Sequence, residues 1–146
     1  MPIISRTLQL RDPPQMTRKS KPFIAIVDDD ESVCYAIKRL VRSLGMEAAT
    51  FASGREFIDH IEAMPSERFE CVILDVQMPG LNGLDVQERL KGRGNRFPVV
   101  FISAHDEVNI RERALAAGAA AFLRKPFAAE RLIKTLRAAV KIGANA

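Results

Sequence analysis

Hydrophobic positions change their spacing in a regular way along this chain. From residue 23 onward, short continuous apolar runs alternate with longer stretches in which apolar residues return every three or four positions. Runs of the first kind have the length of buried strands, and stretches of the second kind form one face of a helix. Strands are predicted at 23–27, 48–51, 71–74, 99–102 and 119–123, and helices at 33–44, 53–64, 82–91, 107–118 and 132–140.

The order and character of these elements indicate the fold class. Strands that are apolar throughout are typical of a parallel sheet covered on both faces. Right-handed crossovers then place helices on both sides of the sheet. We therefore expect an α/β protein with a doubly wound five-stranded parallel sheet. Ligands of such sheets bind beyond the carboxyl ends of the strands, so the residues that follow each strand are the candidates for function.

Polar side chains follow four of the predicted strands. Clustered carboxylates repel one another, and Mg²⁺, which prefers carboxylate, water and phosphate oxygens, relieves that repulsion. A lysine and a serine hydroxyl can hold the remaining phosphoryl oxygens, and a carboxylate can act as the nucleophile of a phosphoryl transfer. The combination predicts phosphate chemistry at a magnesium site. Its members are Asp28, Asp29 and Asp30 after the first strand, Asp75 after the third, Ser103 at the end of the fourth and Lys125 after the fifth.

Each of these residues also has a purely structural explanation. The acids at 28–31 suit the start of a helix, where the dipole favours negative charge. Asp75 can open the turn that continues at Met78-Pro79-Gly80, Ser103 can cap a helix, and Lys125 can be a surface lysine. Their joint placement at one edge of the sheet favours the functional interpretation.

Four stretches resemble the receiver domains of bacterial two-component response regulators. They are Ile24–Glu31, Leu74–Gly83, Phe101–Ala104 and Lys125–Phe127, and the resemblance extends from residue 23 to about residue 141. It implies a flavodoxin-like, chemotaxis-regulator-like fold with strand order 2-1-3-4-5.

The resemblance also implies a role for each site residue. Asp75 would accept the phosphoryl group. Asp28, Asp29 and Asp75 would bind Mg²⁺ together with the backbone carbonyl of Gln77. The two groups expected on the phosphoryl oxygens are Ser103 and Lys125, the ring that switches with Ser103 is Phe122, and the Lys125–Pro126 peptide bond is expected to be cis.

The expected function is signalling rather than turnover. A sensor histidine kinase or a phosphotransfer protein would phosphorylate Asp75, and the domain would then change conformation to control a partner or an output domain, with a homodimer through residues 104–142 as one outcome. Two alternatives stay open. A Mg²⁺-dependent phosphohydrolase with an aspartate nucleophile needs a second acid two residues later, where this chain has Gln77. A receiver-like interaction domain that is never phosphorylated would not need the site residues that are present.

Composition and charge define the limits of the domain. The chain has 146 residues, of which 47% are hydrophobic and 27% charged, as expected for one globular domain. The net charge of +4 comes entirely from residues 1–21, so we expect a basic extension at 1–21, a receiver domain at 22–142 and a tail at 143–146. Nucleic acid is expected only as the ligand of an output domain outside this sequence.

The location expected from the sequence is the cytoplasm. No apolar run approaches the length that crosses a membrane, and the N-terminus lacks the apolar core of a secretory signal. The two cysteines, Cys34 and Cys71, match neither a metal motif nor a disulfide framework, so they are expected to be buried and reduced.

Overall fold

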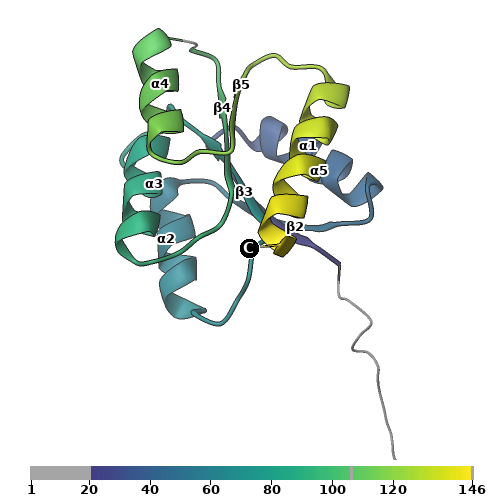
Figure 1. The fold of residues 1–146 in the computed structure, drawn as a ribbon, viewed down its shortest axis with the longest axis horizontal. Coiled ribbons are helices and arrows are strands. Elements are labelled where there is room, and N and C mark those ends of the chain that lie inside the picture. The colour runs from purple at the N-terminus through teal and green to yellow at the C-terminus, as the bar shows by residue number, and fades with distance from the viewer. Residues whose placement is uncertain (1–20, 106, 146) are drawn as a thin grey trace, which may run out of the picture.

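The computed structural model describes residues 21–105 and 107–145, which form one sheet and its helices (Figure 1). Residues 1–20 of the expected basic extension lie outside the described residues. The strands are β1 (Phe23–Val27), β2 (Glu47–Phe51), β3 (Cys71–Asp75), β4 (Val99–Ser103) and β5 (Ala121–Arg124). The helices are α1 (Glu31–Ser43), α2 (Gly54–Ala63), α3 (Gly83–Gly92), α4 (Val108–Ala116) and α5 (Ala129–Asn145).

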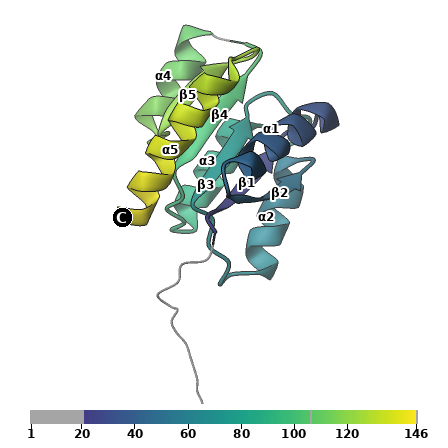
Figure 2. The same ribbon diagram turned by 90° about the vertical axis from the view of Figure 1, so that its right-hand side faces the viewer.

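All strand pairs are parallel, and the order is β2-β1-β3-β4-β5, as expected from the sequence. Figure 1 shows the sheet between two helical layers, with α1 and α5 on one face and α2, α3 and α4 on the other. Figure 2 looks onto the layer of α1 and α5. The strand order reverses between β1 and β3, so the crevice of the doubly wound fold lies beyond the ends of these two strands.

A hydrophobic core lies on each face of the sheet. Because strand side chains alternate, neighbouring residues enter different cores. In β1, Ala25 and Val27 face the layer of α2, α3 and α4, whereas Ile24 and Ile26 face α1 and α5. Burial on both faces explains why the strands are continuous apolar runs in the sequence.

Several element boundaries differ from the sequence prediction, most of them by one or two residues. The last strand begins at Ala121 rather than at residue 119, because Gly118, with a φ of 105°, turns the chain and the Ala119 amide donates back to the Ala114 carbonyl. Helix α5 continues to Asn145, so residues 143–145 of the expected tail are helical. Among the described residues, no helix is long and apolar enough to cross a membrane.

Candidate functional site

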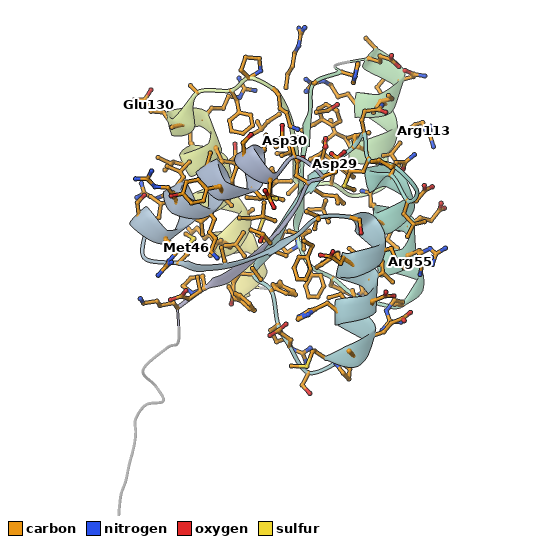
Figure 3. The ribbon with its side chains drawn as sticks, turned by 180° about the vertical axis from the view of Figure 1, so that it is seen from behind. Asp29, Asp30, Met46, Arg55, Arg113 and Glu130 are labelled. Carbon is orange, nitrogen blue, oxygen red and sulfur yellow. The ribbon has the colours of Figure 1, made fainter. Side chains whose placement is uncertain are left out.

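Two aspartates meet at the crevice between β1 and β3. Asp28 directly follows β1, and Asp75 is the last residue of β3. Both are buried, with exposed fractions of 1% and 4%, although carboxylates normally stay in water. Asp29 is exposed beside them, and Asp28, Asp29 and Asp75 each offer a carboxylate oxygen within 4.8 Å of the others. Figure 3 shows Asp29 next to the start of α1, at this edge of the sheet.

Lys125 reaches these carboxylates from the loop after β5. Its Nζ lies 2.9 Å from Asp28 Oδ2, to which it donates a hydrogen bond, and 3.6 Å from Asp75 Oδ1. The Lys125–Pro126 bond is cis, as the sequence resemblance implied. One ammonium group is therefore shared by two buried carboxylates.

The charged groups around Asp75 are more negative than positive. Burial, followed by the charge of Asp28, raises the pKa of Asp75 to about 6, although Lys125 opposes that shift. For Lys125, burial alone would lower the pKa, but the hydrogen bond to Asp28 and the charge of Asp75 raise it. Asp75 is thus mainly ionised at neutral pH and retains an unbalanced charge that a further cation would stabilise.

The residues that follow β3 hold Asp75 in place. Gly83 begins α3 where a Cβ atom would lie 2.4 Å from the Asp75 carbonyl oxygen, so a larger residue does not fit. Its amide donates to the Val76 carbonyl, and the Gln77 amide donates to the Asp75 carboxylate. Asn82 and Asp85 cap the helix reciprocally. These contacts support the strand end that carries the candidate nucleophile.

The third acid of the Asp28–Asp30 run has a structural role. Asp30 caps α1: its side chain accepts hydrogen bonds from the Ser32 amide and hydroxyl, and the hydroxyl bond is the main reason that its pKa is lowered. Beneath it, Cys34 donates from Sγ to the Asp28 carbonyl over 3.3 Å. Both cysteines are free and buried, as predicted.

Ser103 and Phe122 are held by other partners in this structure. Ser103 follows Ile102, the residue that pairs with Asp75 between β3 and β4, and it is fully buried. Its hydroxyl donates to the His105 carbonyl and accepts from the His105 amide. Phe122 is already buried, with 3% of its surface exposed.

Sequence reasoning missed the residues that support these groups. The steric need for Gly83 leaves no local pattern in the sequence, and neither does the position of the Arg111 guanidinium over the Phe122 ring. At Gln77 the backbone amide donates to the Asp75 carboxylate, and the side chain is exposed. The four groups that the structure brings together are Asp28, Asp29, Asp75 and Lys125.

A doubly wound sheet with buried aspartates and a lysine at its crevice is the arrangement expected of a receiver domain. The chain matches the family model of the response regulator receiver domain over residues 24–137 and belongs to that family. It is therefore a receiver domain of two-component signal transduction, a class whose partners are histidine kinases.

Individual relatives agree with this assignment. Response regulator protein TodT of Pseudomonas putida is 41% identical over 119 residues, which are 82% of this chain and 51% of TodT. Transcriptional regulatory protein FixJ of Bradyrhizobium diazoefficiens is 33% identical, over 84% of this chain and 58% of FixJ. The crystal structure of a response regulator receiver protein from Burkholderia phymatum is 56% identical, with a TM-score of 0.74 over 83% of this chain and 96% of that one. The chain spans about half the length of the curated relatives that it matches.

Proposed function

We propose that Asp75 accepts a phosphoryl group from a phosphohistidine of a sensor kinase or a phosphotransfer protein. The observation that carries this proposal is the position of Asp75: a buried, mainly ionised carboxylate at the end of β3, beside Asp28 and within 3.6 Å of Lys125. A carboxylate oxygen would attack phosphorus as the nitrogen–phosphorus bond breaks, which leaves an aspartyl phosphate and a free histidine.

The donor set fits a magnesium ion. Asp28, Asp29 and Asp75 supply hard carboxylate oxygens within 4.8 Å of one another, and Mg²⁺ favours such a set with waters and phosphate oxygens completing its shell. The Gln77 carbonyl is the proposed backbone ligand. Mg²⁺ would neutralise the charge that develops on the phosphoryl oxygens. The raised pKa of Asp75 supports the same assignment, because it reflects negative charge that Lys125 alone does not balance.

Lys125 and Ser103 are proposed to bind the transferred group. The ammonium of Lys125 already contacts both buried carboxylates and can donate to a phosphoryl oxygen. Ser103 would give up its hydrogen bonds with His105 to donate to another oxygen. Because His105 lies three residues before α4, this exchange would act directly on the chain that leads into that helix.

The domain is proposed to act as a phosphoacceptor rather than as an enzyme with turnover. A phosphohydrolase of the aspartate-nucleophile type needs a general acid two residues after its nucleophile. Gln77 occupies that position, and its amide cannot supply the proton. Among the described residues, the acids near Asp75 are those already assigned to the metal.

The output is proposed to leave through residues 104–142, either to a second copy of the chain or to a partner or output domain. The described part of α4 buries only Ala114, so this helix has little to hold it in one position. Transcriptional control is an analogy with FixJ, whose name describes it as a transcriptional regulatory protein.

The direct test is phosphorylation by acetyl phosphate with Mg²⁺, followed by intact mass analysis. One phosphate is expected on the wild-type chain and none on Asp75→Asn. Asp30→Asn is the matched control, because Asp30 lies two residues from Asp28 but caps α1, a role that asparagine can take over. Full labelling of Asp75→Asn would refute the assignment, and so would loss of labelling in both variants.

A further inference from the structure

Helix α4 is held to the sheet by a small number of contacts. Its one fully buried residue is Ala114, and its first turn has no hydrogen bond from a capping side chain. Val108, at the start, is 69% exposed. The C-terminal half is held by Gln87, which is buried in α3 and donates from Nε2 to the Ala114 carbonyl over 3.1 Å. In the N-terminal half, the partly buried Ile110 packs against the core.

Arg111 provides a contact from that half of α4 to β5. Its guanidinium carbon lies 4.9 Å from the centroid of the Phe122 ring, and Nη1 donates to the Phe122 carbonyl over 3.4 Å. A guanidinium over an aromatic face is attracted by the ring quadrupole. The same ring packs on its inner side against Phe101, at a centroid distance of 6.1 Å. Phe122 is thus enclosed between a core ring and a helix side chain.

We propose that Arg111 is a positioning residue that keeps Phe122 buried and joins α4 to β5. The second part of its role, which rests on the proposed function, is to transmit a change at Ser103 to β5. Ser103 is bonded to His105, and the chain from His105 continues into α4. When Ser103 leaves His105, the start of α4 is released, and Arg111 carries the resulting shift to Phe122.

Gln87 and Arg111 would have different roles in such a movement. The Gln87–Ala114 hydrogen bond is buried and lies near the end of the helix, so it would serve as the fixed point. Arg111 is only half-buried, and its contacts with Phe122 are a cation over a ring and a long hydrogen bond. Motion would therefore be concentrated at the start of α4 and at β5.

The first test uses the unphosphorylated chain, so its result does not depend on whether Asp75 accepts a phosphoryl group. The protein is labelled with 4-fluorophenylalanine, and the resonance of Phe122 among the eight phenylalanines is assigned with Phe122→Leu. Its solvent isotope shift between H₂O and D₂O reports exposure of the ring. Arg111→Met is expected to give Phe122 such a shift and to speed amide exchange of residues 121–124 about tenfold, the equivalent of about 1.4 kcal/mol.

Two further variants control this measurement. Arg113→Met removes a cation from the same helix, where the side chain points away from the body of the domain (Figure 3), and should leave both readouts unchanged. Arg111→Lys keeps the charge but loses the planar donor, so an intermediate isotope shift is expected. Wild-type values in both Arg111 variants, or the same response in Arg113→Met, would overturn the positioning role.

The second test adds beryllofluoride with Mg²⁺ as a phosphoryl mimic. In the wild type, amide exchange should change both in residues 107–110 and in residues 121–124. In Arg111→Met the change in residues 107–110 should remain, while the change in residues 121–124 should be lost. A change in residues 121–124 that persists in this variant would overturn the transmission role. A wild type that neither responds to the mimic nor is phosphorylated at Asp75 would instead refute the proposed function, and the test without phosphate would still decide the position of Arg111.

Discussion

Helices α1 and α4 show how differently two helices of the same domain are attached. Asp30 caps α1, which buries Cys34, Ile37 and Val41 against the sheet. At the start of α4 the N-cap residue, Glu107, makes no side-chain cap hydrogen bond, and Val108 and Leu115 of this helix are exposed. Low local burial is a physical basis for local motion. We therefore expect α1 to stay in place and α4 to move.

The position of each helix explains the difference. Helix α1 follows the loop that carries Asp28 and Asp29, so its attachment fixes candidate metal ligands in space. A site of this kind needs side chains held by rigid elements. Helix α4 follows Ser103 and His105, whose hydrogen bonds are proposed to change on phosphorylation. Firm packing there would oppose the change that carries the signal.

The largest expected effect compares truncations in the two helices. Ile37→Ala should lower the free energy of unfolding by about 2–5 kcal/mol, because it leaves a cavity in the core. Leu115→Ala removes a side chain that is 43% exposed and should cost about 0.5 kcal/mol or less. Urea unfolding measures both. Similar losses would show that α4 is anchored as firmly as α1.

The next effect concerns the metal ligands beside α1. Replacing both Asp28 and Asp29 by alanine should slow phosphorylation by acetyl phosphate at least about 100-fold, since ligand loss costs several kcal/mol of charge stabilisation. The fold should persist, because repulsion with Asp75 is relieved and Lys125 keeps one partner. Glu31→Gln, an exposed acid of the first turn, is the control. Unchanged Mg²⁺ affinity in the double variant would reject this site.

A smaller effect should appear in the pH dependence of the free energy of unfolding, measured with a metal chelator present. The folded state raises the pKa of Asp75 to about 6, so the folded chain is destabilised as pH rises from about 4 to 6, and the penalty is complete above that window. Asp75→Asn should therefore raise the free energy of unfolding by about 1–2 kcal/mol at pH 7.5 and leave it unchanged below pH 4. Asp59→Asn, which replaces an exposed acid of α2, is the control. A gain that does not vary with pH would contradict the electrostatic explanation.

Much of the fold could be predicted from the sequence because each element carries its own pattern. Continuous apolar runs gave the five strands, and Asp28, Asp75 and Lys125 could be placed at one edge because parallel strands end together. The strand order and the cis Lys125–Pro126 bond came from the resemblance to receiver domains and are confirmed by the structure.

Contacts between distant elements could not be predicted in the same way. The resemblance to receiver domains singled out Asp28 and Asp29 as metal ligands, whereas the role of Asp30 as the cap of α1 is seen only in the structure. The burial of Phe122 depends on Arg111, which reaches it across the space between two elements. Such pairings depend on packing rather than on periodicity.

The most direct measurement of the central claim is amide exchange across the whole chain with and without beryllofluoride and Mg²⁺. A phosphoryl group on Asp75 is expected to change the position of α4, the weakly attached helix. Exchange should change mainly in residues 104–123 and stay constant in α1 beyond its first turn. Changes confined to α2, with residues 104–123 silent, would contradict it.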